Sequence, residues 1–179
     1  MRTRIDLVDH FNDLGFRKGA EIVVADVRYS EILCQKIPDL TLHCVDPWQK
    51  YGENQRGGPQ AKHDENFKTA KDRLKKYDVN FMKMLSMDAV NSFPYLSLDF
   101  VFIDGHHDFD FVMMDLIEWS KRVRKGGIVA GHDYYNFDRS GVIEAVDCYT
   151  KAHNIKLNII PKNRGGHRDD RPPCFWWVR

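Results

Sequence analysis

The stretch Ala20–Ala25 (AEIVVA) is rich in β-branched residues and carries a single charged side chain. Such a run is typical of a strand buried on both faces, because a strand with one wet face alternates apolar and polar residues. Before it, Ile5–Leu14 has the apolar spacing of a short helix. After it, Tyr29–Ile37 has a helical pattern that stops at Pro38. We therefore predict a buried strand between two helices.

Further apolar runs of strand length alternate with helical patterns along the chain. The predicted strands are Thr41–Val45, Val79–Met84, Leu98–Ile103, Ile128–Gly131, Leu157–Ile160 and Cys174–Val178. The predicted helices are Asp64–Tyr77, Phe109–Val123, with Phe111, Met114 and Ile117 near helical spacing, and Gly141–His153. Strands that alternate with helices imply a parallel sheet with helices on both faces. Because only a loop separates the last two strands, they can form an antiparallel hairpin at one edge.

The length and composition bound the domain organisation. The chain has 179 residues, which suits one domain with its own core, and we predict a single domain over residues 1–179. Segment 49–63 is polar and rich in glycine, so we predict a surface loop or lid there rather than a domain linker.

Charge and hydrophobicity restrict the partners and the compartment. The formal net charge is +1, so no global field points to nucleic acid or to an anionic membrane. No apolar run approaches the roughly 18 residues of a spanning helix. The first residues lack the apolar core of a signal peptide, and we expect a cytoplasmic protein.

Polar side chains follow the predicted strands at their carboxyl ends, where sheets of this type bind ligands. Asp46 closes an apolar strand 25 positions after Glu21, where a carboxylate can accept both hydroxyls of a ribose. The alternative is that Asp46 caps a helix or a loop. Asp88 follows the third strand, where an adenine contact would lie, and it could equally cap the turn at Ala89–Asn91.

Asp104 and Asp133 end two strands predicted to be neighbours. Adjacent parallel strands lie about 4.8 Å apart, so the two carboxylates could converge on one cation. Oxygen ligands favour Mg²⁺, Mn²⁺ or Ca²⁺, whereas His132 or His106 would shift the preference toward a transition metal. The alternative is one helix cap and one pair with a lysine. His106 or His107 could take a proton from a substrate hydroxyl, or either could be a solvated loop histidine.

Four stretches resemble the class I S-adenosylmethionine (SAM)-dependent methyltransferases. More narrowly, they are similar to the small-molecule and sugar O-methyltransferase-like group of bacterial and phage genomes. The stretches are GAEIVVADVRYSEIL (19–33), LHCVDPW (42–48), LDFVFIDGHHDF (98–109) and RKGGIVAGHDYY (124–135). The resemblance covers about Gly19–Tyr149. It implies a Rossmann-like α/β fold whose seven-stranded, mostly parallel sheet has the order 3-2-1-4-5-7-6, with the last strand antiparallel.

The resemblance also implies roles for individual residues. Glu21 would open the SAM motif, Asp46 would hold the ribose, and residues 86–88 would flank the adenine. The residues implied to bind SAM are Glu21, Val23, Asp26, Val27, Asp46, Ser86, Met87, Asp88 and Asp104. The residues implied to hold a divalent cation such as Mg²⁺ are Asp104, His132 and Asp133. The candidates for catalysis are Asp104, His106 and His107.

One motif departs from the family pattern. After the first strand that pattern is acid-x-Gly-x-x-x-Gly, whereas this chain has Val23 and Val27 at the glycine positions. Glycine allows the backbone to approach the methionine part of SAM, at times with positive φ. If the loop keeps its usual path, we expect the valine methyls to occupy ligand space.

Two functional hypotheses follow. The first is a SAM-dependent O-methyltransferase that acts on a small hydroxylated or sugar-like acceptor, with Asp104 and Asp133 holding a cation. The second is a binding or structural protein that keeps the methyltransferase fold without using SAM, which Val23 and Val27 would favour. An NAD-dependent dehydrogenase is disfavoured because the sequence lacks G-x-G-x-x-G. The residues leave open the acceptor and whether the protein forms a homo-oligomer.

Overall fold

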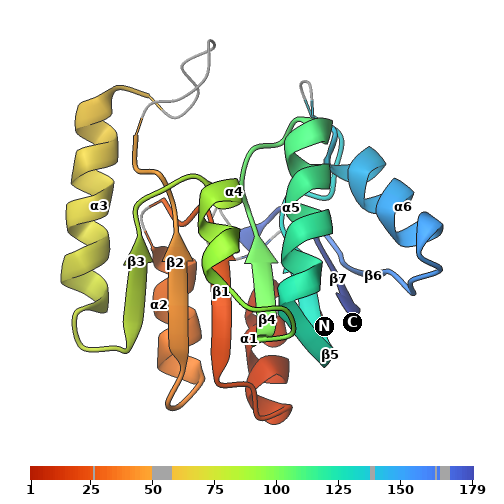
Figure 1. Ribbon diagram of the computed structural model, residues 1–179, viewed down its shortest axis with the longest axis horizontal. Coiled ribbons are helices and arrows are strands. Elements are labelled where there is room, and N and C mark those ends of the chain that lie inside the picture. The colour runs from red at the N-terminus through yellow and green to blue at the C-terminus, as the bar shows by residue number, and fades with distance from the viewer. Residues whose placement is uncertain (26, 50–57, 138–139, 164, 166–169) are drawn as a thin grey trace.

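The computed structural model describes residues 1–25, 27–49, 58–137, 140–163, 165 and 170–179 (Figure 1). Its strands form one seven-stranded sheet in the order β3-β2-β1-β4-β5-β7-β6. The strands are β1 (Lys18–Ile22), β2 (Thr41–Val45), β3 (Val79–Met82), β4 (Leu98–Ile103), β5 (Val123–Gly131), β6 (Asn158–Ile160) and β7 (Cys174–Val178). β7 is antiparallel to both β5 and β6, and the five strands β1–β5 pair in parallel. The predicted strand order and reversed edge are confirmed.

Helices cover both faces of this sheet (Figure 1). They are α1 (Arg4–Asp13), α2 (Arg28–Lys36), α3 (Gln60–Leu74), α4 (Ser86–Ala89), the 3₁₀ turn η1 (Val90–Ser92), α5 (Phe109–Arg122) and α6 (Val142–Ala152). Buried side chains of α1, α2 and α3 form one apolar cluster with the sheet, and those of α5 and α6 form a second. Alternate residues of β4 serve the two clusters: Phe100 packs on Phe11 of α1, with ring centroids 4.4 Å apart, whereas Val101 faces α5. None of the described helices is long and apolar enough to span a bilayer.

Several predicted boundaries differ from the structure by a few residues, and two of the differences have local reasons. The strand predicted to run to Ala25 ends at Ile22, because Val23 takes a φ of +62° that no strand accommodates. The loop predicted over 49–63 gives way to α3 at Gln60, and residues 50–57 lie outside the described residues. Pro59 precedes that helix, and the Gln60 amide donates to the Trp48 carbonyl and to Asp64, which stabilises the first turn.

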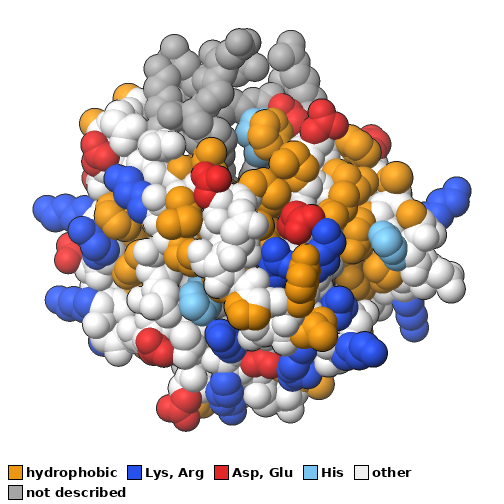
Figure 2. Space-filling model, viewed as in Figure 1, with side chains coloured by type: hydrophobic (Ala, Val, Ile, Leu, Met, Phe, Trp, Pro, Cys, Tyr) orange, Lys and Arg blue, Asp and Glu red, His pale blue; other side chains and the backbone are white. Residues whose placement is uncertain are grey.

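The apolar residues noted at helical spacing in α5 lie on its exposed face. Phe111, Met114 and Ile117 are 52%, 46% and 38% exposed, and hydrophobic side chains gather on this side of the molecule (Figure 2). Leu116 and Trp119 instead point into the core, together with other buried residues of the helix. Two apolar rows share this helix, and only the packing on β4 and β5 selects between them.

Candidate active site

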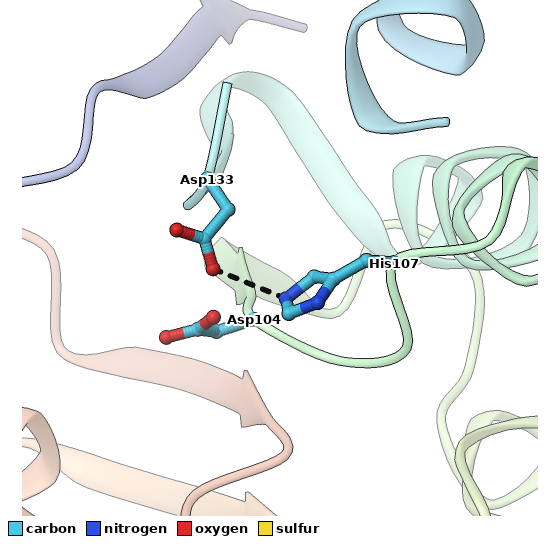
Figure 3. A group of neighbouring side chains, drawn as sticks. All are labelled: Asp104, His107 and Asp133. Atoms are coloured by element: carbon cyan, nitrogen blue, oxygen red, sulfur yellow. Dashed lines mark ion pairs between the residues drawn. The ribbon is translucent and has the colours of Figure 1, made fainter. Parts of the chain in front are cut away.

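The carboxyl ends of β4 and β5 bring two carboxylates and an imidazole together (Figure 3). Asp104 follows β4, and Asp133 follows β5 after His132. His107 lies in the loop between β4 and α5, and its Nε2 is 3.1 Å from Asp133 Oδ2. One ligand atom from each of Asp104, His107 and Asp133 lies within 4.8 Å of the others. The convergence of the two strand-end acids therefore matches the prediction.

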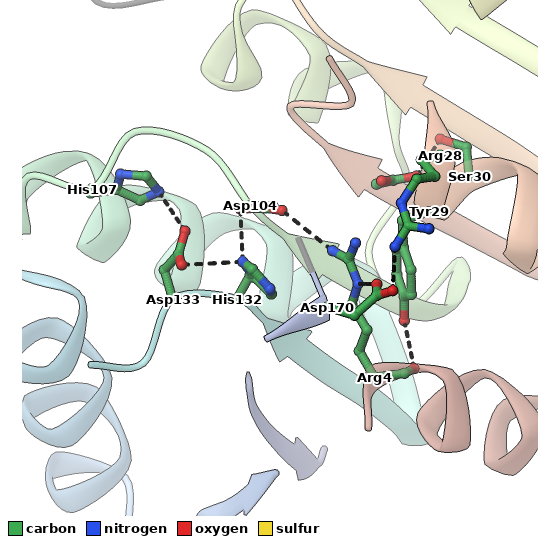
Figure 4. A network of polar contacts seen from close by, with 10 residues as sticks. Arg4, Arg28, Tyr29, Ser30, Asp104, His107, His132, Asp133 and Asp170 are labelled. Atoms are coloured by element: carbon green, nitrogen blue, oxygen red, sulfur yellow. Dashed lines mark hydrogen bonds and ion pairs between the residues drawn. The ribbon is translucent and has the colours of Figure 1, made fainter. Parts of the chain in front are cut away.

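His132 lies behind the two carboxylates. Its Nδ1 is 3.3 Å from Asp133 Oδ1 and 3.6 Å from Asp104 Oδ1, and its side chain is 6% exposed (Figure 4). Its buried Nε2 has no hydrogen-bond partner among the residues that the structure describes. Of the two histidines in the β4–α5 loop, His107 rather than His106 meets the carboxylates. His106 instead contacts Asp108, which donates its backbone N–H to Nδ1 at 3.2 Å.

The two carboxylates experience opposite electrostatic effects. Burial raises the pKa of Asp104, and the nearby Asp133 charge adds to this, while His132 and Arg4 oppose it. Burial also opposes ionisation of Asp133, but hydrogen bonds from His107 and His132 outweigh it and hold its pKa well below the usual range. Although burial disfavours the charged imidazole, the two carboxylates raise the pKa of His132. The site thus keeps Asp133 ionised and positions it to accept hydrogen bonds or bind a cation.

A second network reaches the same site from the other side (Figure 4). Arg4 Nε donates to Asp170 Oδ1 at 2.8 Å, and Arg28 pairs with the other oxygen of Asp170. Arg4 also lies 4.0 Å from Asp104, and its guanidinium stacks 4.7 Å from the Tyr29 ring centroid. Arg4 and Asp170 are 4% and 7% exposed. This buried network joins α1, α2 and the segment before β7.

The β1–α2 loop keeps the backbone conformation that glycine would favour. Val23 and Val27 both have φ of +62°, and Ala25 has φ of +48°. Val27 is fully buried in the core beneath α2, so the expectation that both valines fill ligand space is wrong for Val27. Val23 stays on the side of the strand ends: a Cβ placed on Gly105 would lie 3.3 Å from its Cγ2. Asp26, another predicted SAM contact, lies outside the described residues.

Asp46 holds this loop in place. Its Oδ2 accepts hydrogen bonds from the backbone N–H groups of Val24 and Ala25, both at 3.0 Å, and its Oδ1 accepts one from Trp48 at 2.6 Å. The side chain is 5% exposed. Described residues therefore use three of roughly four acceptor positions of the carboxylate. The loop-capping alternative describes this geometry.

The predicted adenine-flanking residues lie in and beside α4. Ser86 donates to Asp115 and accepts a hydrogen bond from Trp119 Nε1 at 2.8 Å. Burial raises the pKa of Asp115 to about 6. Met87 is half-buried against the second core cluster, and Asp88 is exposed. The sequence reasoning missed Asp115, although an acid on the buried face of an amphipathic helix was a signal that could have indicated it.

Glu21 lies in β1 and is almost wholly buried. It is 3% exposed and accepts a hydrogen bond from Ser30 Oγ at 2.5 Å. Burial raises its pKa to about 8. Glu21 is therefore mostly protonated at neutral pH, and it supports the loop from beneath as a neutral group.

This raised pKa predicts a pH-dependent stability. The carboxyl of Glu21 ionises near its ordinary value of 4.5 in the unfolded chain but near 8 in the folded chain. Between these values the folded state binds more protons, so the free energy of unfolding falls as the pH rises. We expect Glu21→Gln, which stays neutral, to reduce this fall when urea unfolding is measured at about pH 6.5 and 8. That window lies above the raised pKa of Asp115, and equal slopes in the variant and the natural chain would contradict the prediction.

Beside Asp104 and Asp133 lies a cavity of about 500 Å³. The residues that line it are Arg4, Asp104, His132, Asp133, Tyr135, Lys162, Arg171, Pro172 and Pro173. Its volume is within the range of small-molecule sites, which is about 300–1,000 Å³. A small ligand in this cavity would contact the carboxylates on one side and the β6–β7 connection on the other.

Comparison with known proteins shows the family and the fold of the chain. A family model described as a methyltransferase domain matches residues 23–134, more than half of the chain. The chain belongs to this methyltransferase family. The matched segment begins in the β1–α2 loop and includes Asp104, His107 and Asp133. No curated protein matches the sequence.

Solved structures show the same fold at low sequence identity. An O-methyltransferase from Bacillus cereus in complex with SAH is 14% identical, with a TM-score of 0.69 over 98% of this chain and 80% of that chain. The O-methyltransferase TomG from Streptomyces achromogenes, in complex with SAM, is 14% identical, with a TM-score of 0.66 over 98% and 79%. A precorrin-6y C5,15-methyltransferase from Geobacter metallireducens is 13% identical, with a TM-score of 0.64 over 97% and 87%. The predicted class I methyltransferase fold is confirmed.

Proposed function

We propose that this protein is a SAM-dependent O-methyltransferase that acts on a small hydroxylated acceptor. The observation that carries the proposal is the convergence of Asp104, His107 and Asp133 beside a cavity at the carboxyl ends of the strands. The β1–α2 loop lies at the same edge and keeps the positive φ values that a SAM-binding loop uses. The structures bound to SAM and SAH support the same reaction class.

The proposed SAM contacts surround this loop. Asp46 would offer its remaining acceptor position to a ribose hydroxyl, and residues 86–88 would flank the adenine. Glu21 would support the loop from β1 through the hydrogen bond that it accepts from Ser30. Val27 would contribute through its backbone, since its side chain is in the core. Asp26 stays a predicted contact. SAM supplies the methyl group when bound, and the cavity positions the acceptor for in-line attack.

Asp104, His107 and Asp133 could hold a divalent cation. Their three ligand atoms lie close enough to converge on one ion, and two carboxylates with one imidazole suit Mg²⁺, Mn²⁺ or a borderline transition metal. Such an ion would polarise the acceptor hydroxyl. His132 would then position the two carboxylates from behind through its contacts with both.

His107 is the residue that we propose to take the proton of the acceptor hydroxyl. Its ring is half-buried, and Asp133 accepts from its Nε2 and would stabilise the charged imidazolium formed. If a cation occupies the site, His107 would serve as its ligand, and the ion would lower the pKa of the hydroxyl instead. The two roles exclude each other, because a cation bound at Nε2 would replace the hydrogen bond from Nε2 to Asp133. Adding EDTA distinguishes them.

The rival hypothesis, a methyltransferase-fold protein that does not use SAM, depended on the two valines. Val27 no longer supports it, because its side chain is buried in the core. Val23 remains, since its methyls face Gly105 across the strand ends. Titration calorimetry with SAM tests the proposal: we expect saturable binding by the natural chain, and its absence in both this chain and Val23→Gly would overturn it.

Val23→Gly is expected to strengthen SAM binding with little effect on stability. Releasing a β-branched residue from positive φ gains about 1–2 kcal/mol, which the added unfolded-state entropy of glycine offsets by about 1 kcal/mol. Val27→Gly is the matched control at the same φ. It removes a fully buried side chain worth about 1.5–3 kcal/mol and should therefore destabilise the fold. Calorimetry and urea unfolding of both variants measure the contrast, and equal effects would contradict the two side-chain positions.

Asp46→Ala is expected to weaken SAM binding by roughly 1–3 kcal/mol, because a charged acceptor is lost from the ribose and from the loop that carries Val24 and Ala25. Calorimetry of the variant measures this change. Asp72→Ala, on the exposed face of α3, is the control and should bind SAM like the natural chain. Unchanged affinity in Asp46→Ala would remove Asp46 from the proposed contacts.

A further inference from the structure

Two cations, Lys162 and Arg171, line the cavity. Lys162 follows β6 and Arg171 precedes β7, and both side chains are exposed. Within the described part of the chain, neither side chain makes a hydrogen bond or an ion pair. Arg4, the third cation of the cavity, differs because its guanidinium is already bonded to Asp170. Lys162 and Arg171 are therefore available to a ligand.

The backbone fixes both cations at the rim of the cavity. Asn163 donates its N–H to the Arg171 carbonyl at 2.8 Å, so the two flanks of the β6–β7 connection are joined where the cations lie. On one side of Arg171, the side chain of Asp170 is buried against two arginines. On the other side, Pro173 accepts from the Tyr134 N–H at 3.0 Å. Arg171 thus stands on an anchored segment, and its side chain bonds to none of the described residues.

The acids of the cavity do not require these cations. Asp133 is paired with His107 and His132, and Asp104 lies near His132 and Arg4. Lys162 and Arg171 therefore give an excess of positive charge to the side of the cavity that the β6–β7 connection forms. A ligand with a negatively charged group would balance that excess, and a neutral ligand would not.

We propose that Lys162 and Arg171 form an anion subsite, and that the acceptor carries a carboxylate or phosphate group near the hydroxyl that is methylated. The proposal rests on the proposed function, since it places the hydroxyl at Asp104 and Asp133 and the anionic group at the opposite rim. Arg171 would bind the anion with its planar guanidinium, and Lys162 would add a point charge. Pro172 and Pro173 offer an apolar wall to the body of the acceptor.

Three sugars that share one ring test the proposal. Glucose is neutral, glucuronate carries a carboxylate, and glucose 6-phosphate carries a phosphate. Without SAM, we expect at least one charged sugar to bind about tenfold more tightly than glucose in titration calorimetry, since a charge-assisted contact of about 1.4 kcal/mol gives that factor. The stronger of the two charged sugars identifies the kind of anion. The preference should shrink as NaCl is raised, because screening weakens exposed charges.

Variants of the two cations, and of a control lysine, test which side chains cause the preference for a charged sugar. Lys162→Gln and Arg171→Gln should each remove most of the preference for the charged sugar, and Lys151→Gln, on the exposed end of α6, should retain it. Equal affinity for all three sugars, no binding of either charged sugar, or an equal loss in the Lys151 control would overturn the subsite. A failure of the proposed function differs from these outcomes, because it appears as absent SAM binding while the sugar preference stays.

Discussion

Asp170→Asn is expected to lower the free energy of unfolding by about 3–5 kcal/mol, as removal of one partner from a buried ion pair does. The variant leaves Arg4, whose side chain is 4% exposed, without its hydrogen-bonded counter-charge. Arg28 loses its ion pair with the same carboxylate. Urea unfolding followed by circular dichroism measures the change.

The control for this prediction is an exposed ion pair on the same face. Asp9 accepts from Lys36 at 2.7 Å, but the two side chains are 53% and 39% exposed. Because water screens such a pair, Asp9→Asn should cost less than about 1 kcal/mol. A similar, small loss in both variants would show that the Arg4–Asp170 network does not stabilise the fold.

His107→Ala is expected to reduce methyl transfer about 10²–10⁴-fold while SAM affinity stays close to that of the natural chain. The loss is the usual contribution of a positioned general base, and the binding of SAM is spared because His107 lies on the acceptor side. Transfer of a radiolabelled methyl group to a hydroxylated acceptor measures the rate, and calorimetry measures the affinity.

His106→Ala is the matched control for this prediction. It removes a neighbouring imidazole of the same loop that contacts Asp108 and stacks on Phe111. We expect its rate to stay within about tenfold of the natural chain, because it lies outside the carboxylate cluster. A larger loss in His106→Ala than in His107→Ala would reverse the assignment of the two histidines. Adding EDTA to the natural chain then reports whether a divalent cation contributes.

The fold was predictable because its strands are defined by local patterns. Thr41–Val45, Leu98–Ile103 and Cys174–Val178 have the predicted bounds, since each is a short apolar run with clear flanks. Where the local sequence fits two arrangements equally well, only tertiary packing selects one of them. The apolar row at Phe111 is as regular as the buried one, and Val23 leaves the sheet although its residue type favours a strand.

The candidate site was predictable in part for the same reason. Asp104 and Asp133 end neighbouring strands, and parallel strands bring their carboxyl ends to one edge. The choice of His107 over His106 depends on how the loop turns, which no spacing rule describes. No local sequence pattern indicated the contact between Arg4 and Asp170, because the two residues are 166 positions apart in the chain.

That span has a consequence for how the protein is made. A ribosome adds about 5–20 residues per second, so Arg4 waits on the order of 10 s for Asp170 to be synthesised. β7 follows Asp170 and lies between β5 and β6, so this edge of the sheet also waits for β7 to leave the exit tunnel. Until then Arg4 lacks the carboxylate that it bonds in the folded protein, and the nascent chain exposes an open strand edge. Chaperone dependence during translation should therefore be greatest just before β7 emerges.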